Sequence, residues 1–278
     1  MVKPGKVFIS IDMEGISGIV DWAEVDRNNS EYAFARKLMV GDLNAAVEGA
    51  LEAGVKEIVV SDAHGGMRNM RPEDVHEAAY LVRGSPKPNS MMEGIDDSFD
   101  AALYVGYHSM KGTVNGILCH TISGSAVDGV FINGRETGEF GLNSALAGFY
   151  GVPSVFLAGD YAATREAEAF VPGITTAAVK WAAGRYSAKC LHPKESGKLI
   201  TAKVKEALSK PFPEPRRVEE PVEVKLRFTS STMCDVVSLI PSFKRVDGRT
   251  MRGEFVDYQT AINALRAGIY LGGAAERR

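Results

Sequence analysis

Short apolar runs rich in β-branched residues alternate along this chain with segments of helical pattern. Five runs have the length and composition of buried strands, at residues 6–12, 55–62, 79–84, 101–108 and 152–160. Four further segments carry helical patterns, at residues 30–54, 72–78, 139–151 and 162–171. Because a crossover between parallel strands is usually a helix, this alternation predicts an α/β fold with a mainly parallel sheet flanked by helices.

Local signals mark several of these elements. Ser30 is the expected N-cap of the first long helix, and Gly54 is the glycine expected just past its end. Pro72 suits the first turn of the short helix at 72–78. Asn133 followed by Gly134 predicts a β-hairpin within residues 129–138, because this pair favours the backbone angles of a two-residue turn.

The last quarter of the chain has a different pattern. Residues 211–221, PFPEPRRVEEP, are rich in proline and charge and predict a linker or an extended excursion. A strand pattern at 222–228, a short helix at 231–240 and a terminal helix around 257–271 follow it. We therefore expect an α/β domain at 1–210 and a smaller C-terminal α+β portion at 211–278, either a subdomain or a part of the same domain.

Composition excludes some classes of partner. Of the 278 residues 45% are hydrophobic and 24% charged, with a net charge of −3 and both signs interspersed. This balance favours neither a nucleic-acid groove nor an anionic membrane surface, and no segment approaches the ~20 apolar residues of a membrane span. The chain enters a strand pattern almost at once, so we expect no signal peptide. Three cysteines without a CxxC motif fit a reducing cytoplasm.

Acids and histidines collect where the predicted strands end. Ligands of open parallel sheets bind outside the carboxyl ends of the strands, so these side chains are expected to meet in space. Asp12 and Glu14 also point to the same side of an extended chain, because they are two residues apart. The residues concerned are Asp12 and Glu14, Asp62 and His64, His108, Asp160, and Glu139 at the start of a helix.

Carboxylates combined with histidines are the ligand set of zinc or a similar transition metal, whereas magnesium favours oxygen ligands alone. The five candidates Asp12, Glu14, His64, His108 and Glu139 exceed the needs of one tetrahedral zinc ion. Two ions that share a bridging carboxylate would use them all. Asp62 and Asp160 are expected to support ligand histidines by hydrogen bonds. The alternative is structural, because acids at strand ends often cap the next helix.

Several segments also resemble the D-aminopeptidase family of binuclear zinc peptidases. They are KVFISIDMEGISG, VVSDAHGGMRNM, SMMEGIDDSFDAALYVGYH, GILCHT, INGRETGEFGLN, VPSVFLAGD and TTAAVKWAAGRYSAKCLHP. The resemblance runs from about Lys6 to about Pro193 and fades in the last third. One residue more separates His108 from His120 than the family pattern has.

The resemblance implies a role for each matching residue. Asp12 matches the aspartate that bridges two zinc ions, Glu14 and His64 match the other ligands of one ion, and His108 and Glu139 match those of the second. His120 matches a histidine that takes part in catalysis. The resemblance further implies two zinc ions per subunit, short peptides with an N-terminal D-residue such as D-alanine as substrates, and a homo-oligomer in the form of a decameric ring.

The expected reaction is hydrolysis of the first peptide bond by a metal-activated water, with His120 moving a proton or orienting the substrate. The ligand set alone leaves a metal-dependent amidase or phosphoesterase open. A non-catalytic peptide-binding module of a transport system is an alternative from a different class. The chain has no GxGxxG, GxxxxGK[ST] or GxSxG motif, which disfavours dinucleotide binding, P-loop chemistry and a serine hydrolase.

Overall fold

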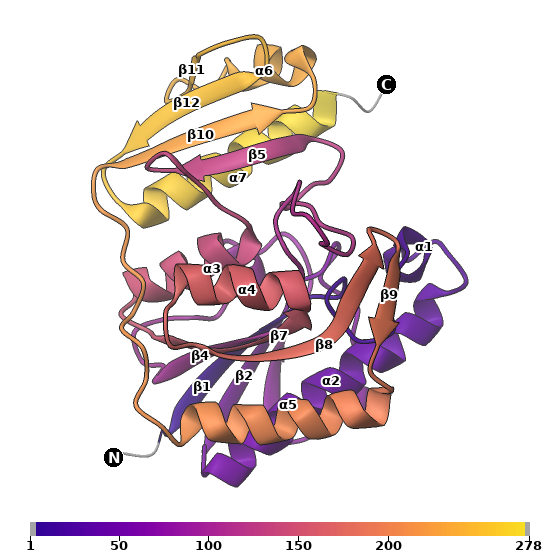
Figure 1. Ribbon diagram of the computed structural model, residues 1–278. Coiled ribbons are helices and arrows are strands. Elements are labelled where there is room, and N and C mark those ends of the chain that lie inside the picture. The colour runs from indigo at the N-terminus through magenta and orange to yellow at the C-terminus, as the bar shows by residue number, and fades with distance from the viewer. Residues whose placement is uncertain (1–3, 276–278) are drawn as a thin grey trace.

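The computed structural model describes residues 4–275 and arranges their strands in two sheets (Figure 1). The larger sheet has seven strands in the order β3-β2-β1-β4-β7-β8-β9. All neighbours in it are parallel except β8 and β9. The bounds are β1 Lys6–Ile11, β2 Glu57–Asp62, β3 Ala79–Val82, β4 Ala101–Tyr107, β7 Ser154–Asp160, β8 Thr175–Gly184 and β9 Ser187–Cys190.

Helices cover both faces of this sheet. Helices α2 (Tyr32–Ala53) and α5 (Pro193–Leu208) lie on one face, and α3 (Glu139–Phe149) and α4 (Tyr161–Phe170) lie on the other (Figure 1). The alternation of side chains along β1 serves both layers, because Val7, Ile9 and Ile11 join the core under α2 while Phe8 joins the opposite core. The predicted α/β fold with a mainly parallel sheet flanked by helices is confirmed.

The strand order reverses between β1 and β4. The chain first builds outward from β1 through β2 to β3, and then returns to place β4, β7 and β8 on the other side of β1. At such a reversal the connections leave in opposite directions, which opens a crevice at the carboxyl ends of the two central strands. Asp12 follows β1 and His108 follows β4, so both lie at this crevice.

The smaller sheet is antiparallel and has five strands in the order β11-β12-β10-β5-β6. The bounds are β5 Val127–Ile132, β6 Arg135–Glu136, β10 Val222–Phe228, β11 Lys244–Arg245 and β12 Thr250–Phe255. Helices α6 (Ser231–Val237) and α7 (Tyr258–Ala275) accompany this sheet at the top of Figure 1. A smaller α+β portion is therefore present, but the hairpin at 127–136 joins it. The domain division at residue 210 stays a prediction.

Several local predictions can be compared with the structure. Gly54 ends α2 in the left-handed conformation, and Asn133 and Gly134 both have positive φ in the turn between β5 and β6, as expected. Ser30 does not cap α2, because Glu31 occupies the N-cap position without a side-chain hydrogen bond. The helix expected at 72–78 is wrong. Only Pro72–Asp74 forms one 3-10 turn, and the chain then extends into β3, which pairs with β2.

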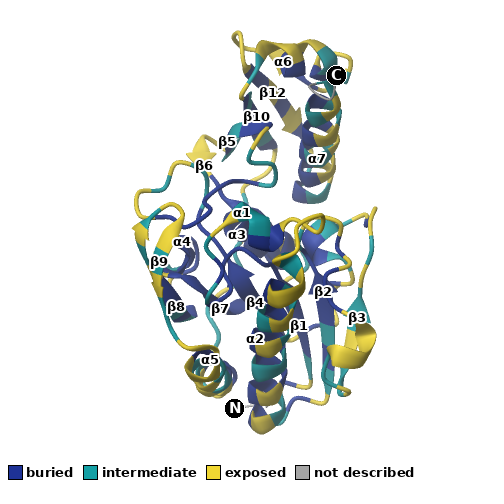
Figure 2. Cartoon of the chain, turned by 90° about the vertical axis from the view of Figure 1, so that its right-hand side faces the viewer, coloured by how far each residue is buried: buried dark blue, intermediate teal, exposed yellow. Residues whose placement is uncertain are grey.

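Buried residues follow the strands of both sheets, while exposed residues line the outer sides of α2 and α5 (Figure 2). Helices α5 and α1 (Trp22–Val25) and strands β8, β9, β11 and β12 complete the fold without having been expected from the sequence. Within residues 4–275 no helix combines the length and the apolar character that crossing a bilayer requires.

Candidate metal centre

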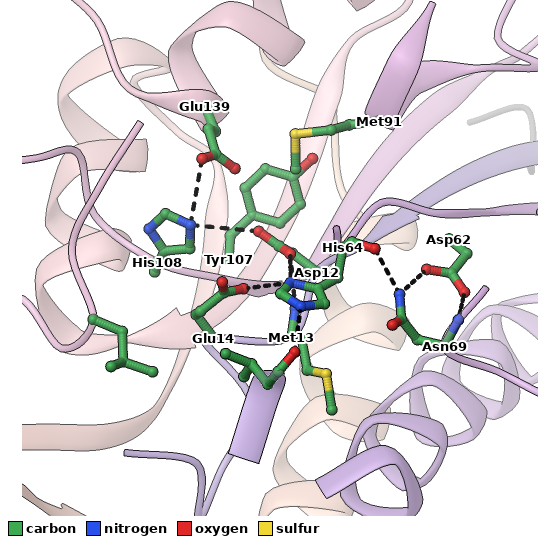
Figure 3. A network of polar contacts seen from close by, with 12 residues as sticks. Asp12, Met13, Glu14, Asp62, His64, Asn69, Met91, Tyr107, His108 and Glu139 are labelled. Atoms are coloured by element: carbon green, nitrogen blue, oxygen red, sulfur yellow. Dashed lines mark hydrogen bonds and ion pairs between the residues drawn. The ribbon is translucent and has the colours of Figure 1, made fainter. Parts of the chain in front are cut away.

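The site lies where β1, β2 and β4 end (Figure 3). Asp12 and Glu14 come from the loop after β1, His64 from the loop after β2, and His108 directly follows β4. Glu139 is the first residue of α3, which the β5–β6 hairpin delivers to the same place. All five side chains are buried or nearly so. The structure thus brings together every residue that the sequence predicted as a metal ligand.

Two glycines allow the ligand loop to lie directly on β4. The backbone N–H of Asp12 donates to the carbonyl of Val105, and that of Gly15 donates to the carbonyl of Gly106. A Cβ atom at Gly15 would lie 2.0 Å from the carbonyl oxygen of Tyr107, which no real side chain tolerates. Gly106 has a φ of +68°, which favours glycine. These contacts fix the position of the two carboxylates relative to His108.

The two carboxylate oxygens of Asp12 face different histidines. Its Oδ1 lies 3.4 Å from Nδ1 of His64, and its Oδ2 lies 3.5 Å from Nε2 of His108. Glu14 completes the first group, with its Oε2 2.9 Å from Nδ1 of His64. Glu139 completes the second, with its Oε1 3.5 Å from Nε2 of His108. The site therefore consists of two ligand groups that meet at one carboxylate.

Each histidine is held by a backbone carbonyl at the ring nitrogen that faces away from the carboxylates. Nε2 of His64 lies 3.0 Å from the oxygen of Val25, and Nδ1 of His108 lies 3.0 Å from that of Ser109. Nδ1 of His120 lies 2.9 Å from the oxygen of Leu118. Because a carbonyl oxygen only accepts, these nitrogens donate, and the opposite nitrogens direct a lone pair toward the acids when the rings are neutral.

The distances from Asp12 to the two histidines fit metal binding better than direct hydrogen bonding, whereas Glu14 hydrogen-bonds His64 directly. Two ligand atoms that bind one tetrahedral zinc at about 2.0–2.1 Å lie about 3.4 Å apart. The separations of 3.4 and 3.5 Å between histidine nitrogens and Asp12 match this value. Among the described residues, Nε2 of His108 is a buried nitrogen without any hydrogen-bond partner, which a metal ion would satisfy. The donor set of carboxylates and imidazoles also suits zinc.

The electrostatics of the site favour bound positive charge. Burial alone would raise the pKa of Asp12, yet the closely facing imidazoles of His108 and His64 hold that pKa well below the ordinary aspartate range. Burial opposes charge on His64 and His108 as well, but Glu14 and Glu139 respectively raise their pKa values well above the usual histidine range. Without a metal ion, protons on the two histidines supply the positive charge, so metal binding must release them.

His120 lies between the two ligand groups. Its ring stacks on that of His108 with centroids 4.1 Å apart, and Trp22 contacts its ring edge-to-face at 5.3 Å. Its Nε2 lies 3.8 Å from Oε1 of Glu14 and 3.7 Å from Oε1 of Glu139. At these distances His120 makes no direct hydrogen bond to either glutamate. It can serve as a further ligand of the second group or contact a substrate held between the two groups.

Asp62 and Asp160 do not have the contacts expected of them. Among the described residues neither carboxylate accepts a hydrogen bond from a ligand histidine, because backbone carbonyls hold the rings. Asp62 instead accepts from the backbone and side-chain amides of Asn69, whose Nδ2 also donates to the carbonyl of His64 (Figure 3). Burial raises the pKa of Asp160, and the nearby Lys180 charge opposes this only in part.

Lys180 is a residue that the sequence predictions missed. It lies in β8, its side chain is completely buried, and its Nζ donates to the carbonyls of Glu14 and Ile19 at the two ends of the ligand loop. Burial lowers its pKa to about 8. The available signal was a lone lysine within the otherwise apolar run TTAAVKWAAG, since a buried lysine requires specific partners.

Comparison with known proteins agrees with this geometry. A profile of the D-aminopeptidase family matches residues 6–267. The chain belongs to this family. A D-aminopeptidase of Bacillus subtilis (strain 168) is 38% identical over 250 residues, which cover 88% of this chain and 89% of that protein. The structure of the Zn-dependent D-aminopeptidase DppA from Bacillus subtilis, described as a self-compartmentalizing protease, matches with a TM-score of 0.95 at 35% identity, over 98% of this chain and 100% of that one.

These findings confirm the predicted family, fold class and metallo-aminopeptidase class. They support zinc as the metal of the family, while the number of ions, the substrate and the role of each ligand in this chain remain predictions.

Proposed function

We propose that the protein removes N-terminal D-residues such as D-alanine from short peptides and uses two zinc ions per chain. The observation that carries this proposal is the placement of Asp12, whose two oxygens face His64 and His108 separately. One carboxylate shared between two histidine-containing groups is the arrangement expected of a two-metal hydrolase. In this proposal Asp12, Glu14 and His64 hold one ion, and Asp12, His108 and Glu139 hold the other.

The chain's own residues have distinct tasks in this reaction. Zinc bound there would act as a Lewis acid and lower the pKa of a bound water toward neutrality. Ser109 and Val25 keep the ligand nitrogens of His108 and His64 in the correct tautomer through their carbonyl oxygens. His120, oriented by Leu118 and Trp22, is placed to hold a proton at Nε2 and pass it to the leaving amine.

The first test is release of D-alanine from D-alanylglycine by the purified protein, with L-alanylglycine as the comparison. We expect cleavage of the D-peptide alone, loss of activity on chelation and recovery with added zinc. Cleavage of neither peptide by a protein that binds two metal ions would contradict the substrate and favour a metal-dependent amidase or phosphoesterase. Binding of the peptide without any turnover would favour a non-catalytic binding module.

The ligand assignment has a separate test. His108→Ala is expected to lower the zinc content from two ions to one and to remove most activity, because it deletes a ligand of one group only. The matched control is His76→Ala, since His76 lies outside both ligand groups and contacts Glu48 instead. Zinc content by mass spectrometry under native conditions checks both variants. Two bound ions and normal turnover in His108→Ala would contradict the assignment.

We further propose that the protein forms a homo-oligomer, a decameric ring, and works in the cytoplasm. The description of DppA as self-compartmentalizing supports assembly. The cysteines Cys119, Cys190 and Cys234 are all free, which supports a reducing compartment. Light scattering coupled to size exclusion measures the particle mass, and a monomer at micromolar concentration would contradict the ring.

A further inference from the structure

A pocket of about 490 Å³ opens beside the metal centre, and its lining carries an excess of positive charge. The loop after α1, the loop after β2 and the residue after β3 form its walls, and three arginines, Arg27, Arg68 and Arg83, line it. Its volume lies within the range of about 300–1,000 Å³ typical of small-ligand sites. Since three arginines line one space, the pocket suits a small anion.

Among the described residues, none of the three pocket arginines forms an ion pair. Within residues 4–275 the arginines that form ion pairs are Arg165, Arg227, Arg245, Arg249 and Arg252. The only acid in the pocket lining is Asp26, and its Oδ1 already accepts from the backbone and side chain of Asn28. Three neighbouring positive charges repel one another unless a negative charge lies between them. Because no carboxylate of the pocket is free to do this, the arginines attract an anion from solution.

The pocket adjoins the metal centre at His64. This residue lines the pocket, while its Nδ1 faces Asp12 and Glu14. Its Nε2 donates to the carbonyl of Val25, another residue of the pocket wall. A peptide whose first bond lies at the metal centre would extend past His64 toward the arginines.

Hydrogen bonds hold the part of the pocket wall that Tyr32 and Asn69 form. The hydroxyl of Tyr32 donates to Oδ1 of Asn69 at 2.6 Å, and both residues line the pocket. Asn69 is fixed in turn by Asp62 and by the carbonyl of His64. The contact that Asp62 makes thus supports the pocket wall and the His64 backbone together. A preformed wall reduces the entropic cost of binding a small ligand.

Resting on the proposed function, we propose that this arginine pocket binds the C-terminal carboxylate of the peptide substrate. Arginine recognises carboxylates through two parallel hydrogen bonds, and the pocket shares His64 with the metal centre. The preferred substrates would then be short peptides with a free C-terminus. Longer peptides and C-terminally blocked peptides would lose this contact.

The test compares D-alanylglycine with D-alanylglycine amide, using the full-length zinc-loaded protein. We expect kcat/KM for the free acid to exceed that for the amide by about tenfold or more, mostly through KM, because the amide cannot form charge-assisted hydrogen bonds. Arg68→Gln and Arg83→Gln should each reduce this ratio several-fold. The matched control is Arg71→Gln, since Arg71 is also exposed and lies three residues further along the chain but outside this pocket.

The outcomes separate this inference from the proposed function. Equal cleavage of the acid and the amide by the wild type would overturn the carboxylate site while the peptidase function stands. If neither peptide is cleaved, calorimetry with N-acetylglycine decides, because it needs no turnover. Binding that Arg68→Gln weakens and Arg71→Gln leaves intact would support the site without the function. No binding, or binding that both variants retain, would overturn the site.

Discussion

At the scale of single residues, Lys180 holds the ligand loop from behind by donating to the carbonyls of Glu14 and Ile19. Burying the amine of Lys180 completely costs desolvation free energy, and these two hydrogen bonds offset that cost. Tyr107, also buried, hydrogen-bonds through its hydroxyl with Ser10 and Asn143. The loop that carries Asp12 and Glu14 is thus positioned by Lys180, which belongs to neither group of candidate ligands.

We expect Lys180→Met to weaken zinc binding by about 10–100-fold, the range found for residues that orient metal ligands. The substitution removes the donor to the carbonyls of Glu14 and Ile19, so the loop that carries Asp12 and Glu14 is held less firmly. Competition with a chelator measures the affinity. The control is Lys189→Met on β9, whose lysine is exposed. Unchanged zinc affinity in Lys180→Met would show that the loop needs no support from β8.

Asp42 provides a residue-scale prediction about pH. Burial raises its pKa to about 7, although hydrogen bonds from the Ser196 hydroxyl and the Ser17 amide lower it in part. Because the folded state binds the proton more tightly than the unfolded state, the stability that Asp42 contributes is complete below about pH 4 and is lost as the pH rises to about 7.

Asp42→Asn should therefore become more stable relative to the wild type as the pH rises from 5 to 8. A shift of about three pKa units corresponds to at most about 4 kcal/mol in the free energy of unfolding. Urea unfolding of both proteins at the two pH values measures the difference. A gap between the two proteins that is the same at both pH values would contradict a raised pKa.

At the scale of elements, α2 packs against α5 through Gly49. A Cβ atom there would lie 2.5 Å from the carbonyl oxygen of Thr201 and 2.9 Å from Cβ of Val204. Gly41 lies in the same helix, but nothing lies within 4 Å of its Cβ position. Packing therefore requires glycine at position 49, whereas at position 41 there is space for a side chain.

We expect Gly41→Ala to stabilise the protein by about 0.5–1 kcal/mol, because alanine loses less backbone entropy in a helix. Gly49→Ala should destabilise it by about 1–3 kcal/mol, since α5 must move away. Thermal unfolding of the pair measures both effects in one helix. Stabilisation by both substitutions would show that helix propensity and not packing decides at Gly49.

At the scale of the whole molecule, the two sheets share one continuous core. The cluster that contains Phe140 and Ala145 of α3 also contains Val224 of β10 and Leu265 of α7. The smaller sheet is completed by β5, whose partner β10 lies about ninety residues later in the chain. The linker at 211–221 also contacts α3, where the Arg216 guanidinium donates to the carbonyl of Gly141.

A chain truncated after residue 210 should therefore be destabilised and bind hydrophobic dyes. Removal of β10 exposes the edge of β5 together with Val130 and Ile132, which are now buried. Dye fluorescence and limited proteolysis against the full-length chain measure this. Cooperative unfolding of the truncated chain at the wild-type temperature would instead support residues 1–210 as an independent domain.

Local sequence patterns were enough to predict the α/β class and the acids and histidines that the fold brings together. Apolar runs alternating with helical patterns impose a parallel sheet, and the acids and histidines at 12, 14, 64 and 108 end strands whose carboxyl ends share one edge. The hairpin at Asn133 and Gly134 was equally local, because its turn depends only on the two residues that occupy it.

Other features depend on contacts between segments that are distant in sequence. The segment 72–78 has a helical pattern, but β3 takes up the chain immediately after it through pairing with β2. The contacts of Lys180, the Val25 carbonyl behind His64 and the arginine pocket are assembled from segments far apart in sequence. No local pattern encodes such contacts, because burial and hydrogen bonding depend on which distant residues the fold brings together.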